Sequence, residues 1–159
     1  MEKIKQLIFQ KFPRMVMGVL LFCAVIINVA NVVSRHVFQS SIVWAEEVLI
    51  FIFIWIVFIG AVSVTMGKAH LKMDFLSMTI PASFSKVFEV ASNLLSIAVC
   101  LIVVYASTAA ITPLWRFKQL SVVSEIPMYI PHFAIPLGFG LMVVLLIVNL
   151  ITELISKKA

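Results

Sequence analysis

Charge is scarce in this sequence, and the charged residues that it has avoid the long apolar runs. Of the 159 residues, 12% are charged and 63% are hydrophobic. A soluble domain of this length could not bury so much apolar surface, so the composition indicates an integral membrane protein. The net charge of +5 does not indicate a nucleic-acid partner, because the basic residues cluster beside apolar runs, where anionic membrane lipids are the expected partner.

No Asp, Glu, Lys, Arg or His lies in the middle third of any apolar run. Ion-coupled pumps usually carry such a group at depth, or use broken helices near the midplane. Cysteine is also rare: Cys23 and Cys100 both lie inside apolar runs, which excludes a disulfide or metal framework. A membrane enzyme would need a polar cluster at one interface, and His70 with Asp74 is the only candidate, without an evident nucleophile. We therefore expect no catalytic, cofactor-binding or metal-binding residue in this chain.

What the sequence does contain is four long apolar runs, which predict an all-α integral membrane protein. We expect a single membrane domain, residues 1–159, with transmembrane helices at about 15–33, 44–67, 87–112 and 133–151. Runs of this length cross a hydrocarbon core of roughly 30 Å. The first run is too long for a signal peptide and lacks a small-residue cleavage site, so it is expected to be retained.

Two shorter segments are predicted to lie along the membrane surface. Residues 1–12 alternate apolar and charged sides at helical spacing and indicate an interfacial amphipathic helix, ended or bent near Pro13. Residues 75–80 predict a second interfacial segment after the second span. Within the spans, Asn28 and Asn31 are expected to bond to a neighbouring helix rather than to line a path. Pro136 is expected in the first turn of the last helix.

The most informative stretch of the sequence is 40–74, because two adjacent carboxylates stand at the start of its membrane helix. Glu46 and Glu47 precede nineteen uncharged residues. Acidic residues at a helix start and an interfacial tryptophan are both ordinary features of membrane proteins. We expect Arg35 to pair with Glu46 or Glu47, the alternative being that both carboxylates are solvated and only cap the helix. Four aromatic residues share one face of this helix, and two small residues would allow close helix approach: Trp44, Phe51, Trp55 and Phe58, then Gly60 and Ala61.

Taken together, this stretch resembles the small membrane subunit of the tripartite ATP-independent periplasmic (TRAP) transporters. The resemblance rests on one set of residues, namely Arg35, Phe38, Trp44, Glu46, Glu47, Trp55, Phe58, Gly60, Ala61, His70 and Asp74. A second motif, residues 124–131 (SEIPMYIP) followed by 135–138 (IPLG), resembles the entry to the last helix of that subunit. Glu125 departs from the small or apolar residue expected there.

The resemblance implies an accessory role in a sodium-coupled secondary transporter that imports an organic acid of the dicarboxylate or sialic acid class. The large membrane subunit would carry the sodium and substrate sites, and a periplasmic binding protein would deliver the substrate. This chain would hold the large subunit in the bilayer. The interface residues would be Arg35, Trp44, Glu46, Glu47, Phe51, Trp55, Phe58, Gly60, Ala61, His70 and Asp74. The alternative is a self-assembling four-helix exporter. Such a protein would require a carboxylate buried within the membrane, whereas this chain has two at the membrane boundary.

Basic residues divide unequally between the two ends of the expected helices. Nine lie on one side (Lys3, Lys5, Lys11, Arg14, Lys68, Lys72, Lys86, Lys157 and Lys158) and three on the other (Arg35, Arg116 and Lys118). The positive-inside rule then predicts that both termini lie in the cytoplasm, and the resemblance implies that the membrane is the bacterial inner membrane. Arg116, Lys118 and Glu125 would lie on an outward loop, where they either dock the binding protein or anchor the third helix among lipid headgroups.

Overall fold

The computed structural model describes residues 2–66 and 82–156, with side chains described over 11–66 and 90–152. Over these residues the chain forms four helices: α1 (Glu2–Val37), α2 (Ala45–Met66), α4 (Ala82–Arg116) and α5 (Tyr129–Ser156). Each contains a stretch that is long and apolar enough to cross a membrane: Lys11–Val37, Ala45–Met66, Val90–Arg116 and Tyr129–Thr152. The prediction of an all-α chain with four such helices is confirmed. His70, Asp74 and the predicted surface segment 75–80 lie outside the described residues.

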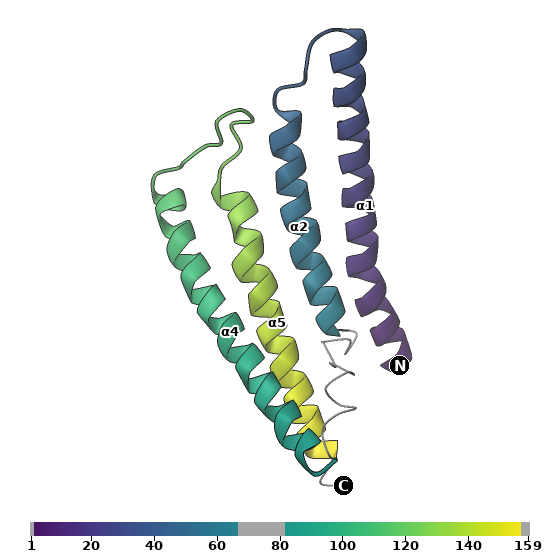
Figure 1. Ribbon diagram of the computed structural model, residues 1–159, viewed down its shortest axis with the longest axis vertical. Helices are drawn as coiled ribbons and strands as arrows, with labels where there is room; N and C mark the ends of the chain where they lie inside the picture. The colour runs from purple at the N-terminus through teal and green to yellow at the C-terminus, as the bar shows by residue number, and fades with distance from the viewer. Residues whose placement is uncertain (1, 67–81, 157–159) are drawn as a thin grey trace.

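The helices form an open row rather than a closed bundle (Figure 1). Helix α1 packs on α2, α2 packs on α5, and α5 packs on α4. Each helix in such a row contacts only its neighbours in the row, so the two broad faces of the layer stay uncovered. Only 6–22% of the apolar stretch of each helix is buried within the chain. Where α2, α4 and α5 meet, a small core forms from Val62, Cys100, Met142, Val143 and Leu146.

The first helix is longer than the sequence predicted at both ends. It does not end near Pro13, because Pro13 lies inside α1 and is buried. Continuing the helix costs one backbone hydrogen bond at the proline, whereas ending it there would leave several backbone polar groups without helical partners. At the other end, Arg35 and His36 belong to the last turn of α1 instead of opening a loop. Basic side chains are favourable there because they oppose the negative end of the helix dipole.

The connection between α4 and α5 is shorter than expected. Pro113 lies within α4 and not in the loop, since α4 continues to Arg116. Helix α5 begins at Tyr129, so Pro131 occupies the first turn that was assigned to Pro136, and Pro136 lies further inside. The remaining loop, residues 117–128, lies at the same end of the molecule as the α1–α2 loop, residues 38–44 (Figure 1). We call this the loop end.

Candidate functional site

The loop end is organised by the two adjacent carboxylates in the first turn of α2, which bond in opposite directions. Glu46 faces α1: its Oε1 lies 3.1 Å from Nη2 of Arg35. The side chains of Arg35 and Glu46 are 56% and 72% exposed, so water weakens this ion pair. The expected pairing of Arg35 with one of the two acids is present, and Glu46 is the partner.

Glu47 bonds instead to the loop between α4 and α5. Its Oε2 accepts a 2.7 Å hydrogen bond from the backbone N–H of Ser124, which is 77 residues further along the chain. The hydroxyl of Ser124 lies 3.0 Å from that of Ser121, which is buried. A charged acceptor makes such a bond stronger than one between neutral groups. Glu47 therefore joins the first helical hairpin of the chain to the second.

The α1–α2 loop is fixed by a buried asparagine. Asn31, only 8% exposed, accepts a 2.9 Å hydrogen bond at Oδ1 from the backbone N–H of Ile42. The expectation that Asn31 bonds to a neighbouring helix is corrected, because its partner is loop backbone. Ser34 Oγ donates a 2.6 Å bond to the carbonyl of Ser40, and Gln39 between them has a positive φ of 55°. The loop thus returns the chain tightly to α2.

The α4–α5 loop contains a short β-hairpin, which we call the tip hairpin (residues 119–128). Leu120 and Pro127 form an isolated antiparallel bridge. Backbone bonds of 2.9 Å run from the N–H of Ser121 to the carbonyl of Ile126, and from the N–H of Met128 to that of Gln119. The hairpin is bordered by Trp115 and Tyr129, whose rings lie 4.5 Å apart between centroids.

The three charged residues predicted to form a docking surface lie on or beside this hairpin. Arg116 ends α4, Lys118 follows it, and Glu125 comes directly after Ser124; all three are exposed. Lys118 and Glu125 have positive φ angles of 48° and 53°, in the left-handed region that non-glycine residues seldom adopt. Whether these residues dock a protein or anchor a helix stays a prediction.

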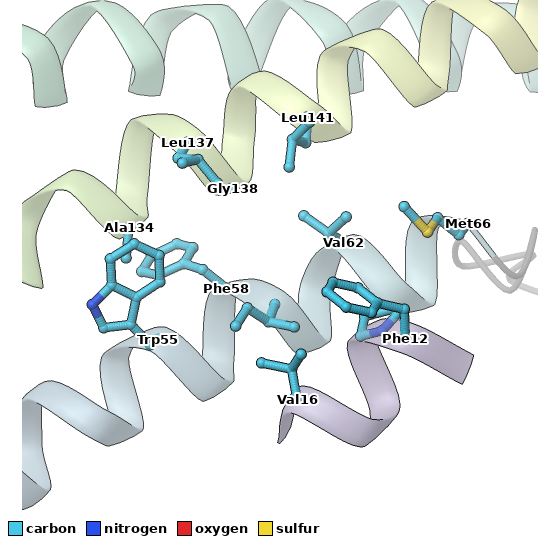
Figure 2. A pocket seen from close by; sticks show the side chains of 12 residues that line it. Phe12, Val16, Trp55, Phe58, Val62, Met66, Ala134, Leu137, Gly138 and Leu141 are labelled. Carbon is cyan, nitrogen blue, oxygen red and sulfur yellow. The ribbon is translucent and has the colours of Figure 1, made fainter. Parts of the chain in front are cut away.

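The aromatic face of α2 borders an apolar groove between three helices (Figure 2). The groove has a volume of about 320 Å³. Its lining comes from α1 (Phe12, Pro13, Val16), α2 (Trp55, Phe58, Ile59, Val62, Met66) and α5 (Ala134, Leu137, Gly138, Leu141). Of the four aromatic residues expected on this face, Trp55 and Phe58 line the groove. Phe51 is partly buried, and Trp44 is exposed near the loop end.

Several of the predicted interface residues pack inside this chain. The Phe58 ring lies 5.7 Å from that of Phe139 on α5. A Cβ atom at Gly60 would lie 3.4 Å from Sδ of Met17, so Gly60 faces α1. Ala61 packs against the core between α2, α4 and α5. The expectation that these residues also contact another chain stays a prediction.

Sequence reasoning missed the residues that complete these contacts. Ser124 stood in a recognised motif, but nothing in the sequence indicated that its backbone N–H would meet Glu47. Gly138 also stood in that motif, and the structure gives it a role: a Cβ atom there would lie 2.9 Å from the Cβ of Phe58. Within the described part of the chain, no three His, Cys, Asp or Glu residues are placed to hold a metal ion.

Residues 24–155 match the family described as "Tripartite ATP-independent periplasmic transporters, DctQ component". The chain belongs to this family. It is a small permease component of a TRAP transporter, a multi-pass membrane protein and not an enzyme.

Curated relatives at low identity agree with this assignment. The chain is 27% identical over 118 residues to the "Isethionate TRAP transporter permease protein DctMQ" of Oleidesulfovibrio alaskensis, covering 74% of this chain and 19% of that protein. It is 24% identical over 139 residues to the "C4-dicarboxylate TRAP transporter small permease protein DctQ" of Vibrio cholerae, covering 74% of this chain and 60% of the relative. Over 71 residues it is 31% identical to the "Sialic acid TRAP transporter permease protein SiaT" of Haemophilus influenzae, covering 44% and 12%. The chain thus spans less than two thirds of the length of each of these relatives.

Proposed function

We propose that this chain is the non-catalytic small subunit of a sodium-coupled, binding-protein-dependent importer of an organic acid. The observation that carries the proposal is the open row of helices, which encloses little of its own apolar surface. A row of this kind supports a neighbouring protein in the bilayer better than it encloses a polar path of its own. Sodium and substrate would bind in the large subunit. The C4-dicarboxylate and the sialic acid in the names of two relatives favour an organic acid of the dicarboxylate or sialic acid class as the substrate.

The side of α2 that borders the groove is proposed as the contact surface for the large subunit. Trp44, Phe51, Trp55 and Phe58 lie on this side, and an apolar hollow inside a membrane must be filled by lipid or by protein side chains. The opposite side of α2 carries a plain apolar stripe, which suits contact with lipid: Ile50, Phe53, Val57 and Val64, all exposed. The interface would also include Arg35, Glu46 and Glu47, which would position the loop ends of α1 and α2 against the large subunit. His70 and Asp74 would belong to the same interface.

The proposal also includes placement in the membrane. Both termini lie in the cytoplasm, and the loop end faces the periplasm. The loop end then meets the binding protein, and Arg116, Lys118 and Glu125 take part in docking.

Co-expression with the large subunit tests the assignment, since the two chains should copurify in mild detergent. A photo-crosslinking residue at Ile59, in the groove, should capture the large subunit, whereas the same residue at Val57 on the opposite side of α2 should not. Uptake in liposomes should require both chains and the binding protein. If this chain instead purifies as a homo-oligomer and transports alone, it is an exporter and the proposal is wrong.

A further inference from the structure

The tip hairpin presents apolar side chains to the surroundings on a backbone that is held rigidly. Val122 is 95% exposed, the largest exposed fraction among the large hydrophobic residues described, and Val123 beside it is 43% exposed. Figure 1 shows the loop rising beyond the ends of α4 and α5 to the level of the start of α2. An exposed valine on a mobile loop would be ordinary, but this one stands on a hydrogen-bonded turn.

Three sets of contacts hold the turn in place. The two backbone bonds and the bridge at Leu120 and Pro127 close its base. The Ser121–Ser124 hydroxyl contact closes its tip, and Glu47 ties Ser124 to α2. Lys118 before the hairpin and Glu125 within it have positive φ angles, a conformation that costs free energy and persists only where surrounding contacts offset that cost. A lipid surface requires no fixed backbone shape, whereas a protein surface gains affinity from a contact that is already in its bound form.

We propose that the tip hairpin is a preformed docking knob for the soluble binding protein, that Val122 is its apolar contact, and that Glu47 fixes its position. The inference rests on the proposed function. Arg116 and Lys118 stand at the base of the knob with Glu125 as the one acid between residues 116 and 128. The complementary surface is therefore a shallow apolar hollow bordered mainly by carboxylates. The apolar contact supplies affinity, and the charges raise the rate of encounter.

Val122→Ser tests the contact, with Val43→Ser as the matched control. Val43 is another well-exposed valine at the loop end, but it lies on the α1–α2 loop. In liposomes that contain both membrane subunits, Val122→Ser should raise the binding-protein concentration for half-maximal uptake by about tenfold, the effect of losing one buried apolar side chain. Maximal uptake and copurification should be unchanged, and Val43→Ser should match the parent chain.

Glu47→Ala tests the positioning role, and Glu46→Ala is its control. Loss of Glu47 should speed hydrogen exchange at the Ser124 amide and raise the binding-protein concentration for half-maximal uptake more than Glu46→Ala does. Glu46→Ala should leave exchange at Ser124 unchanged, because Glu46 bonds to Arg35. If Glu47→Ala speeds exchange without affecting the half-maximal concentration, Glu47 does not position the knob.

Three other outcomes would overturn the proposal. If Val122→Ser leaves the half-maximal binding-protein concentration unchanged while uptake still depends on binding protein, Val122 contacts lipid and not the binding protein. The proposed function then survives. If Val122→Ser abolishes copurification, the knob contacts the large subunit instead. If uptake by the unaltered complex does not depend on binding protein at all, the proposed function itself fails.

Discussion

Gly138 of α5 lies against Phe58 of α2 so closely that a Cβ atom at position 138 would stand 2.9 Å from the Cβ of Phe58 and 3.0 Å from its Cδ1. Cβ atoms do not approach so closely, and Cβ of Phe58 is fixed to the backbone of α2. The two helices could accommodate even alanine only by moving apart. This contact sets the distance between the two helical hairpins, and Phe139 supports it by packing its ring against that of Phe58.

We expect Gly138→Ala to destabilise the chain, by about 1–3 kcal/mol as is typical of overpacking. Gly140→Ala is the matched control, because nothing lies within 4 Å of the Cβ atom it would add. Thermal unfolding of the detergent-solubilised protein, followed by circular dichroism, compares the two. Equal midpoints for Gly138→Ala and Gly140→Ala would contradict the close approach of α2 and α5.

The ion pair at the loop end predicts a specific rescue. Arg35→Glu should weaken the attachment of α1 to α2, and adding Glu46→Lys should restore it, whereas adding Glu47→Lys should not. Because both partners are more than half exposed, the effect should not exceed ~1 kcal/mol and should shrink as salt is added. Melting temperatures at low and high salt measure it. Rescue by Glu47→Lys rather than Glu46→Lys would show that the pairing is different in the membrane.

Gly60→Leu should separate α1 from α2, since even a Cβ atom there already reaches Met17 Sδ. Gly60→Ala should be tolerated, because the end of a methionine side chain can move by a few tenths of an ångström. Gly18→Leu is the control, as its surroundings within the chain are open. A photo-crosslinking residue at position 60 should capture α1 of the same chain. Capture of the large subunit as the main product would place Gly60 in the intersubunit contact instead.

The proposed orientation can be tested with cysteine labelling in intact cells. Val122→Cys is the reporter at the loop end because the side chain is nearly fully exposed, whereas the hydroxyl-bonded Ser121 is buried. A membrane-impermeant thiol reagent should label Val122→Cys but not Ser156→Cys at the end of α5, in a background where Cys23 is replaced. Labelling of Ser156→Cys alone would reverse the assignment of the two sides.

Reversing the charges of Arg116 and Lys118 together distinguishes docking of the binding protein from anchoring of α4 among lipid headgroups. Under the docking proposal, uptake falls at limiting binding protein, is partly recovered when more is added, and becomes less sensitive to salt. Copurification with the large subunit should be unaffected. Unchanged uptake at every concentration of binding protein would mean that the two residues anchor α4 among lipid headgroups.

The sequence predicted the helices well because a membrane leaves few alternatives. Apolar runs long enough to cross it must form helices, so the identity of each span follows from composition. The ends of the helices were predicted less well, because a helix continues past the hydrocarbon boundary wherever further backbone hydrogen bonds stabilise it. Arg35, Pro113 and Tyr129 all lie in helices beyond the expected limits.

Pairing was predictable only in part. Opposite charges near the same boundary indicated that Arg35 would meet one of the two glutamates, but choosing Glu46 required the rotation of α2 relative to α1. The partner of Glu47 is a backbone N–H, and every residue except proline offers one, so no side-chain pattern could indicate it. The order of helices in the row was likewise hidden, because lipid-facing and helix-facing apolar residues look alike in a sequence.

The seam between α2 and α5 determines how the two helical hairpins can move relative to each other. It is fastened at two separate points: Phe58 against Gly138 within the membrane, and Glu47 on Ser124 at the loop end. One fastening would let the two helical hairpins pivot about it. Two fastenings along the seam prevent sliding and pivoting within the plane of the layer, so the rotation that remains between the two hairpins is a hinge about the seam itself.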